Sequence, residues 1–439
     1  MASKFEALRG MEDILPGEIE KWQWIEEKTR IFFESQGFKE IRTPILEYTD
    51  LFTRSVGESS DIVHKEMFSF EDRGGRNVTM RPEMTASVAR SVIEKGLLSQ
   101  AKSLRFYYIG PMFRAERPQA GRKRQFHQIG IEMINEAGLE ADFTAIKTLY
   151  DFLKFTGVSQ PHIRVNDLGE SSERTKVLDG LRLYFSNQKA KLCSDCEWRL
   201  EKNVLRIFDC KVPSCQPVID DAPWEKISPV SEHFQKLTDE LESHKIPFEV
   251  KRRLVRGLDY YTGVVFEVSA STLGAQDALA GGGRYDRLYS DLGGKTTPCT
   301  GYSIGFERLL TVLDKEEQPL SKKLAEATVF FIPLVNASDG EAQDISEKVN
   351  EAVSDLRRLG IRAVRNYNLT SNLGDHLKAA NKIGAKYVVI LGQSEFQSGT
   401  WQVKNMQLKE QVGVPFYDSD KRTGGLFLYF QQKEGLKLI

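Results

Sequence analysis

The segment RAERPQAGRKR, residues 114–124, concentrates positive charge in one short stretch. It holds five Lys and Arg residues against the single acid Glu116. Arginine can grip phosphate oxygens through two parallel charge-assisted hydrogen bonds, each of which contributes about 1.5–3 kcal/mol. Polyanion binding is one interpretation of this stretch and an ordinary solvated loop is the other, so the flanking elements decide between them.

Residues 104–134 are predicted to form two strands joined by this basic loop. Alternation along the second strand gives it a polar face, formed by Phe126, Gln128, Gly130 and Glu132. Its other face is mostly apolar and is expected in the core: His127, Ile129, Ile131 and Met133. An amide and a carboxylate on either side of a glycine suit a small polar ligand that lies on a sheet. On the first strand the same parity aligns Met112, Arg114 and Glu116.

The segment RPEMT, residues 81–85, lies where a predicted strand gives way to a helix that runs towards Glu94. One interpretation of Glu83 and Thr85 is an acid near a helix N-terminus and a hydroxyl cap. The other is a carboxylate and a hydroxyl that together hold a substrate ammonium group. The sequence alone favours neither.

The segment LVRGLDYYTGVVFEV, residues 254–268, ends in an alternating strand at 264–268. Arg256, Tyr260 and Tyr261 therefore lie on the approach to that strand, where side chains can reach a cleft. Paired tyrosines are also common packing residues, so a recognition site and half-buried packing are both open interpretations.

Two later segments contain glycine. The run AGGGRYDRL from Ala280 lacks the spacing of a dinucleotide fingerprint, and its glycines would let backbone approach a ligand closely. The segment GYSIGFERLL, residues 301–310, is predicted as a strand that leads into a helix with Arg308 in its first turns. An ordinary surface arginine is the alternative.

Four of the five cysteines, Cys193, Cys196, Cys210 and Cys215, have a spacing similar to that of a zinc ribbon. The second pair has four intervening residues instead of two, which weakens the pattern. No metal ligand is therefore assigned firmly, and zinc on these cysteines stays an open alternative.

The composition describes a globular chain long enough for about three domains of ordinary size. It has 439 residues, of which 40% are hydrophobic and 28% charged, which excludes collagen-like, coiled-coil and disordered classes. Lys and Arg total 61 against 62 Asp and Glu, so nucleic acid would have to bind a local basic patch.

Residues 1–17 lack the continuous apolar core of a signal peptide, and no stretch approaches the roughly 20 apolar residues that span a bilayer. An odd number of cysteines, five, argues against a disulfide framework. The chain is predicted to be cytoplasmic, without membrane contact.

The elements around these segments follow from periodicity. Residues 18–36 are predicted as an amphipathic helix capped by Gly37, and residues 38–46 as a short extended run at an edge or interface. Residues of about 165–250 are polar and partly helical, which is typical of an insertion. A charged linker at 314–326 marks a domain boundary.

Beyond the linker, apolar strands alternate with helices, which predicts a small parallel α/β domain. Strands are expected at 329–335, 361–367 and 387–391, helices at 341–359 and 372–383, and an antiparallel edge at 401–408.

Together these segments resemble a class II aminoacyl-tRNA synthetase, specifically the histidyl-tRNA synthetase family of the bacterial type, over nearly the whole chain. GFKEIRTPILE is similar to the dimer-interface motif, FRAERPQAGRKRQFHQIGIE to the second class II motif and GYSIGFERLL to the third. LVRGLDYYTGVVFE is similar to the segment particular to the histidine enzyme, and its order among the other three makes the resemblance specific.

The resemblance implies roles for individual residues. Several positions are implied to bind histidine. Glu83 and Thr85 are implied to hold the α-amino group, and Glu132 and Tyr261 to flank the imidazole. The others implied to contact the amino acid or line its pocket are Gln128, Tyr260, Tyr285, Arg114 and Arg256. Positions implied to bind ATP are Arg114 at the α-phosphate, Glu116, and Phe126 and Arg308 at the adenine. Arg256 and Arg114 are implied to be catalytic, with Arg256 near the carboxylate and the α-phosphate in place of a metal ion.

The implied fold is α+β: an antiparallel sheet flanked by helices in a catalytic domain at 1–325, with a helical insertion, and an anticodon-binding α/β domain at 327–439. The implied activity is ATP-dependent, Mg²⁺-assisted ligation of L-histidine to tRNA(His) through an adenylate, by a homodimer. The motif GDHL at 374–377 replaces the lysines that relatives often carry, which leaves the anticodon contacts open.

Two alternatives remain at this point. One is a catalytically silent paralogue such as the regulatory subunit of ATP phosphoribosyltransferase, against which both arginines and the extra domain argue. The other is a synthetase for another amino acid, against which Glu132 and the LDYY segment argue.

Overall fold

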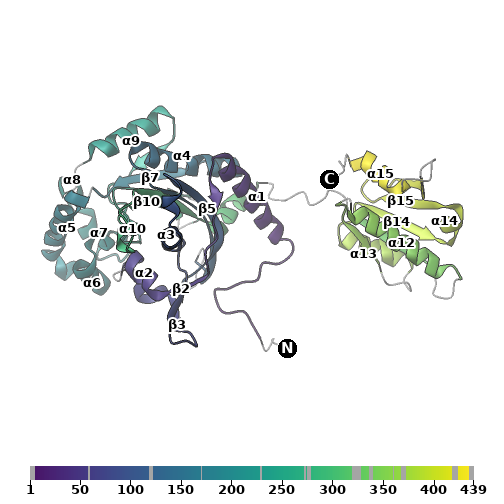
Figure 1. Cartoon of the computed structure of the whole chain (residues 1–439), viewed down its shortest axis with the longest axis horizontal. Coiled ribbons are helices and arrows are strands. Elements are labelled where there is room, and N and C mark those ends of the chain that lie inside the picture. The colour runs from purple at the N-terminus through teal and green to yellow at the C-terminus, as the bar shows by residue number, and fades with distance from the viewer. Residues whose placement is uncertain are drawn as a thin grey trace. The chain divides into compact units, whose positions relative to one another are not determined.

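The computed structural model describes residues 5–57, 60–117, 122–169, 171–227, 230–270, 273, 278–318, 328–335, 340–358, 360–366, 372–417 and 424–434. The chain divides into two compact units, Met1–Lys322 and Lys323–Ile439 (Figure 1). The expected linker at 314–326 begins inside a helix that continues to Lys315, and its residues 319–326 lie outside the described part.

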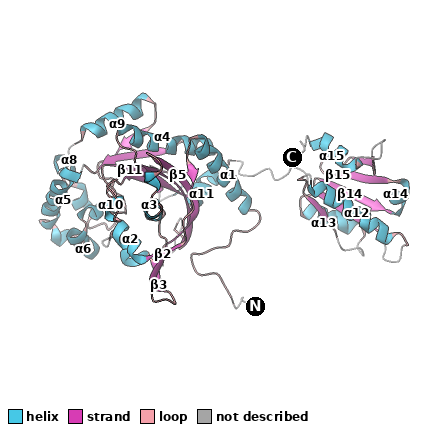
Figure 2. Ribbon diagram, viewed as in Figure 1, coloured by secondary structure: helices cyan, strands magenta, loops and turns pink. Residues whose placement is uncertain are grey.

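In the described part of the first unit, eight strands form one sheet in the order β1-β5-β6-β11-β10-β9-β7-β8 (Figure 2). They are β1 (Lys39–Glu40), β5 (Leu104–Phe113), β6 (Gln125–Ile134), β7 (His162–Asp167), β8 (Phe248–Val250), β9 (Val264–Ser269), β10 (Ala278–Arg284) and β11 (Cys299–Gly305). Neighbouring strands from β5 to β7 run antiparallel, and β1 and β8 join the two ends in parallel. The predicted antiparallel sheet is confirmed.

One face of this sheet packs against helices and forms the largest core. The helices are α1 (Ile19–Ser35), α4 (Leu139–Thr156), α9 (Glu232–Ser243) and α11 (Phe306–Lys315). Ile129, Ile131 and Met133 are fully buried there, as their alternation on β6 predicted. Gly37 follows α1 with φ +82°, the left-handed conformation expected of a residue that ends a helix.

The opposite face of the sheet packs against α3 (Thr85–Glu94), around which the strands curve in Figure 1, and against several further helices. These are α5 (Ser171–Ser186), α6 (Ser194–Lys202), α7 (Gln216–Asp220), α8 (Trp224–Ile227) and α10 (Leu288–Asp291). The insertion expected at about 165–250 is narrower than predicted. Its two ends are strands β7 and β8 of the eight-stranded sheet, and α9 packs in the largest core. The part that is added to the sheet and its largest core is therefore α5 to α8.

A smaller sheet of three described strands has the order β2-β4-β3. Its strands are β2 (Leu46–Tyr48), β3 (Phe68–Glu71) and β4 (Asn77–Met80), with α2 (Thr49–Val56) directly after β2. The extended run predicted at 38–46 is thus divided between β1 and β2, which belong to different sheets. Short helical turns complete the unit: η1 (Ile62–Glu66), η2 (Leu97–Ser99), η3 (Lys189–Lys191) and η4 (Val204–Asp209).

The second unit has a described five-stranded sheet in the order β13-β12-β14-β15-β16. Its elements are β12 (Val329–Leu334), α12 (Ala342–Arg358), β13 (Ala363–Arg365), α13 (Leu373–Lys382), β14 (Tyr387–Gly392), α14 (Gln393–Ser398), β15 (Thr400–Asn405), β16 (Gln411–Pro415) and α15 (Gly425–Glu434). The first three strands of the order are parallel, as predicted. The antiparallel strand predicted at 401–408 is confirmed by β15, which pairs with β14, but its position at the edge was wrong, because β16 pairs with the outer side of β15. Among the described helices of both units, none is long and apolar enough to cross a bilayer.

Candidate active site

Glycines form much of the sheet surface that faces away from the largest core. On β11, Gly301 pairs with Glu132 of β6, and Ser303 pairs with Gly130. On the other side of β11, the same two residues pair with Gly283 and Gly281 of β10. Residues directly opposite each other in a sheet share a face, so polar side chains here stand among positions that have no side chain.

The space left by these glycines is filled by side chains of the site itself. A Cβ atom at Gly301 would lie 2.6 Å from Oε2 of Glu132, and one at Gly281 would lie 2.1 Å from Nη2 of Arg256. The sequence predicted that the glycine run lets a ligand approach the backbone. In the structure, the side chains that approach the backbone of these glycines belong to Glu132 and Arg256, two of the residues predicted to bind the ligand.

Glu83 is buried and is held by the start of α3. Its carboxylate accepts the backbone N–H groups of Thr85 at 2.7 Å and Ala86 at 2.8 Å, and the hydroxyl of Tyr260 donates to it at 3.4 Å. Burial raises the pKa of Glu83, against the lowering effect of those backbone N–H groups. The capping interpretation of Thr85 was wrong, because Thr85 is the first residue of α3 and follows the N-cap Met84, and its hydroxyl donates to Glu132 at 2.8 Å.

Glu132 lies at the centre of a buried hydrogen-bond network. Its second oxygen accepts the hydroxyl of Tyr285, which is itself buried. Burial raises the pKa of Glu132 to about 8, although the hydrogen bonds from Tyr285 and Thr85 lower it. A carboxyl group with this pKa retains its proton in most molecules at neutral pH.

Two arginines approach the site from different elements. Arg256, which precedes β9, donates from Nη1 to Oε2 of Glu267 at 2.8 Å. Arg114, which follows β5, donates from Nε to the carbonyl of Pro82 at 3.0 Å, and its guanidinium carbon lies 5.2 Å from the ring centre of Phe126. Both guanidinium groups are thus oriented by protein contacts before any ligand is present.

A third arginine, Arg308, belongs to the first turn of α11. Its Nη1 donates to the carbonyl of Ala278 at 2.5 Å. Burial lowers the pKa of this guanidinium, and repulsion from Arg122 adds to the effect. A bound anion or an aromatic ring beside Arg308 would therefore stabilise its positive charge.

These side chains share one cavity of about 1600 Å³. The predicted site residues on its wall are Glu83, Thr85, Arg114, Glu116, Phe126, Gln128, Arg256, Tyr260, Tyr261, Tyr285 and Arg308. Glu132 joins them through its hydrogen bonds to Thr85 and Tyr285. The residues that sequence reasoning selected from five separate segments are therefore brought together.

The basic loop differs from the prediction in one respect. Strand β5 ends at Phe113, so Arg114 and Glu116 follow the strand instead of continuing its alternation. Glu116 accepts from Nη1 of Arg122 at 3.0 Å on the returning side of the loop. Residues 118–121 of the loop lie outside the described part.

Sequence reasoning missed Tyr108, Glu267 and Ser303. Tyr108 is buried and pairs with Gly130 across β5 and β6, and its ring fills the space where a Cβ atom of residue 130 would lie. Glu267 lies on β9 between the apolar residues Phe266 and Val268, and its carboxylate accepts from Arg256. Parity was the signal for all three, since each pairs directly with a glycine of the polar face.

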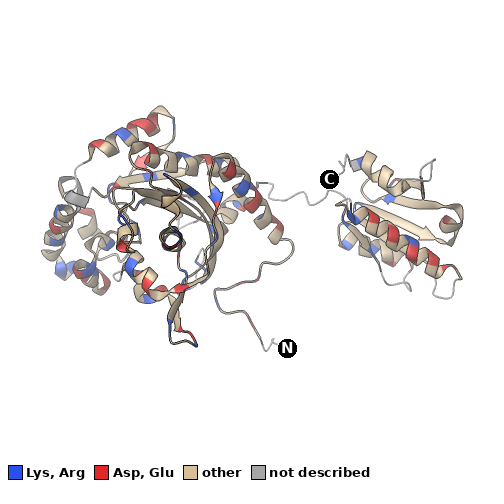
Figure 3. Cartoon of the chain, in the orientation of Figure 1, with Lys and Arg blue, Asp and Glu red and all other residues tan. Residues whose placement is uncertain are grey.

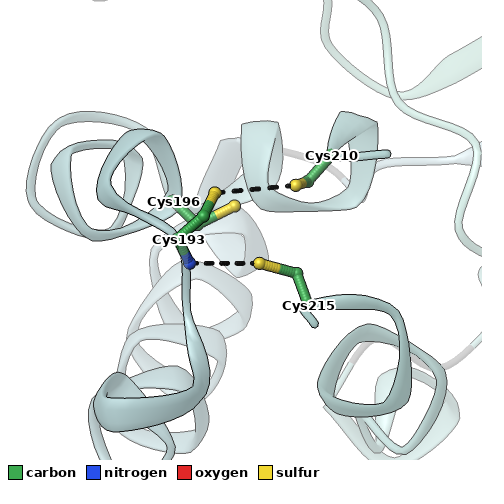
Figure 4. A group of neighbouring side chains, drawn as sticks. All are labelled: Cys193, Cys196, Cys210 and Cys215. Atoms are coloured by element: carbon green, nitrogen blue, oxygen red, sulfur yellow. Dashed lines mark hydrogen bonds between the residues drawn. The ribbon is translucent and has the colours of Figure 1, made fainter. Parts of the chain in front are cut away.

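The four cysteines of the predicted zinc pattern also come together (Figure 4). Cys193 precedes α6, Cys196 lies within it, Cys210 follows η4 and Cys215 precedes α7. Their sulfur atoms all lie within 4.8 Å of one another.

Comparison with known sequences gives one consistent result. A model of the histidyl-tRNA synthetase family matches residues 10–179 and 219–309, and a model of an anticodon-binding domain matches residues 328–421. The histidine–tRNA ligase of Desulfatibacillum aliphaticivorans is 44% identical over 424 residues, which cover 95% of this chain and 98% of that protein. That of Halothermothrix orenii is 42% identical over 420 residues, which cover 93% and 96%.

A solved structure agrees with these sequences. The apo histidyl-tRNA synthetase of S. aureus superposes with a TM-score of 0.75 at 29% identity and covers 94% of this chain and 97% of that one. Because the family model matches more than half of the residues and the two relatives align along nearly their whole lengths, the chain belongs to the histidyl-tRNA synthetase family.

Proposed function

We propose that the cavity binds L-histidine and ATP, joins them as histidyl-adenylate with release of pyrophosphate, and then transfers histidine to tRNA(His) with release of AMP. The observation that carries the proposal is the presence of two preoriented arginines, Arg114 and Arg256, on the wall of the cavity that also holds Glu83 and the Glu132 network. The histidine carboxylate and the α-phosphate of ATP are both anions and must meet in this cavity, where the fixed positive charges of the two arginines stabilise them.

Histidine is held by its two polar ends. The α-amino group is bound by Glu83 and Thr85, which supply a buried carboxylate and a hydroxyl. The imidazole lies between Glu132 and Tyr261, a carboxyl group and a phenol that can pair with its two ring nitrogens. Gln128, whose Oε1 is buried without a hydrogen-bond partner among the described residues, contacts the amino acid, and Tyr260 and Tyr285 line the pocket.

ATP occupies the part of the cavity beside the basic loop. Arg114 contacts the α-phosphate, and the ring of Phe126 and the guanidinium plane of Arg308 enclose the adenine. The contact between Arg114 and Phe126, with 5.2 Å from guanidinium carbon to ring centre, supports a shared role of these two residues at one nucleotide. Glu116 lies on the same wall.

The first step needs no general base. The histidine carboxylate is already ionised at neutral pH and attacks the α-phosphorus in line, so that a new phosphorus–oxygen bond forms as the bond to pyrophosphate breaks. Arg256, between this carboxylate and the α-phosphate, stabilises the negative charge that spreads over the phosphoryl oxygens. Its ion pair with Glu267 holds it in place for that task.

Mg²⁺ is proposed as the cation that neutralises the remaining phosphates. It prefers carboxylate and phosphate oxygens, and Glu116 on the cavity wall is a carboxylate of the required kind. Arg256 serves the α-phosphate itself in place of a further metal ion.

Figure 3 shows acidic and basic residues mixed over the helices of both units. The tRNA is therefore held by local groups of basic residues and not by the net charge of the chain. Arg122 and Lys123 of the basic loop line the cavity, and we expect them to contact the acceptor end of the tRNA. The second unit, which matches an anticodon-binding domain, contacts the anticodon. In GDHL, His376 is 1% exposed, and Asp375 is acidic and donates its backbone N–H to the capping side chain of Asn372 at 3.1 Å, so neither adds positive charge there.

A second copy of the chain is proposed to pack against the small sheet. Leu46, Tyr48 and Phe70 lie 47%, 61% and 49% exposed, and pairing with β4 places all three on one face. Exposed apolar side chains in such a group mark an interaction surface.

A cytoplasmic location is supported by the cysteines, none of which forms a disulfide among the described residues.

ATP–pyrophosphate exchange with each amino acid in turn tests this function. Exchange that depends on histidine supports it. Exchange with a different amino acid would identify a synthetase of other specificity, and no exchange with any amino acid would identify a silent paralogue.

A further inference from the structure

The cysteine cluster has the dimensions of a site for a single metal ion. The sulfur atoms of Cys193 and Cys210 are 3.8 Å apart, and all four sulfurs lie within 4.8 Å of one another. Four sulfurs placed about 2.3 Å from one zinc ion are roughly 3.8 Å apart in a regular tetrahedron. Figure 4 shows the four side chains converging from three segments on a common centre.

The surroundings favour thiolates over a disulfide. Cys196, Cys210 and Cys215 are buried, and none of the four is bonded to another. The backbone N–H of Cys193 donates to Sγ of Cys215 at 3.1 Å, and that of Val212 donates to Sγ of Cys210 at 3.4 Å. Such second interactions orient metal-binding sulfurs and stabilise their negative charge.

We propose that these four cysteines bind one zinc ion in a closed tetrahedral site. Four intervening residues between Cys210 and Cys215 fall within the spacing that structural zinc sites use, so the feature that weakened the sequence pattern does not exclude the metal. Four thiolates leave no position open for substrate, and the ion is therefore structural and not catalytic.

The ion would fix a segment that reaches the active site. Between the two cysteine pairs, Arg199 of α6 and Arg206 of η4 both donate to Oδ2 of Asp61, at 3.0 and 3.1 Å. Asn203 donates to Oδ1 of Asp259 at 2.6 Å. Asp259 lies three residues after Arg256, so zinc clamps the insertion onto the segment that carries Arg256, Tyr260 and Tyr261.

Gly257 shows how close this contact is. A Cβ atom at residue 257 would lie 2.9 Å from Nη1 of Arg206, whose side chain is buried. The residue after Arg256 thus packs directly against the segment between the cysteine pairs. Without the ion, nothing would join the four thiols, three of which are buried, and the segment between the cysteine pairs would be less firmly held.

Metal analysis of the full-length protein, purified under reducing conditions without added metal, tests the site. We expect about one zinc per chain in the wild type and in Cys299→Ser, whose cysteine lies on β11 outside the cluster. We expect a loss of at least about 80% of the zinc in Cys196→Ser/Cys215→Ser, because a site with two of four ligands binds weakly. Zinc unchanged in that variant would overturn the proposal, as would iron in place of zinc.

Cobalt exchange keeps the test independent of the folding of the variants. Dialysis of wild-type protein against a chelator and then against Co²⁺ should produce thiolate-to-metal charge-transfer absorption and the intense visible bands of a tetrahedral sulfur site. Spectra of octahedral aqueous cobalt alone would contradict the site.

Hydrogen exchange on the zinc-free wild-type protein tests the clamp. We expect amide protection to fall in residues 197–208 and in residues 256–261, with no change in β12 and β14 of the second unit. Protection that is unchanged at 256–261 would contradict the positioning role. Both readouts are independent of catalytic activity, so they stand apart from the outcome of the exchange assay.

Discussion

The guanidinium group of Arg256 occupies the space that a side chain on Gly281 would need. A Cβ atom at residue 281 would lie 2.1 Å from Nη2 of Arg256, while Nη1 of the same group donates to Glu267 at 2.8 Å. Gly281 and Glu267 pair directly between β10 and β9. A glycine and a carboxylate on neighbouring strands together set the position of this cation.

Gly281→Ala should therefore displace Arg256 without removing its charge. We expect adenylate formation to fall by about 10²-fold, the scale for misplacement of a catalytic group by about 1 Å. Steady-state pyrophosphate exchange measures it, with ATP KM expected to change only a few-fold. Gly340→Ala, at a position with open space, is the control. Equal activity of the two variants would show that the position of Arg256 is not set by this contact.

Glu132→Gln and Tyr261→Phe should each raise the KM for histidine more than the KM for ATP. Buried groups that pair with the imidazole nitrogens favour histidine because a competitor leaves them unpaired, which yields roughly 10⁴-fold rejection. The two KM values are measured in the exchange assay. Equal effects on both substrates would argue against the assignment.

The Glu132 carboxyl should also make stability depend on pH. Its pKa is raised by burial from 4.5 to about 8, so between these values the folded protein holds a proton that the unfolded chain has lost. Its contribution to stability is thus largest below pH 4.5 and falls as pH rises towards about 8, by at most roughly 1.4 kcal/mol per pH unit.

Glu132→Gln removes this titration. The stability of the variant relative to wild type should therefore increase between about pH 5 and about pH 8, as measured by urea unfolding. The exposed Glu140→Gln serves as the control and should show no such trend. Parallel pH profiles of wild type and Glu132→Gln would mean that the carboxyl is already ionised in the folded protein.

Removal of residues 327–439 should separate the two steps of the reaction. The cavity lies wholly within the first unit, so we expect adenylate formation to stay within a few-fold of the full chain. Aminoacylation of tRNA(His) should fall by at least about 10²-fold, because the contacts of a whole RNA-binding unit are lost. A proportional loss of both activities would contradict the division of roles.

The polar face of β6 could be predicted because alternation is a local property of a strand. The position of Arg114 outside the strand could not be predicted, because alternation alone does not show that β5 ends at Phe113. The bond of Thr85 to Glu132 joins residues far apart in the chain, and nothing local distinguishes it from a helix cap. Likewise, the weak, partly helical pattern of residues 165–250 did not indicate that α9 packs in the largest core.

The central claim is that fixed guanidinium charge, without a general base, activates ATP towards the histidine carboxylate. Arg256→Ala tests it most directly in the ATP–pyrophosphate exchange assay. Arg253→Ala is the matched control, because Arg253 lines the same cavity but pairs with Asp220. We predict that Arg256→Ala binds ATP within a few-fold of wild type but exchanges pyrophosphate at least about 10²-fold more slowly, whereas Arg253→Ala stays near normal. Near-normal exchange by Arg256→Ala would contradict the account.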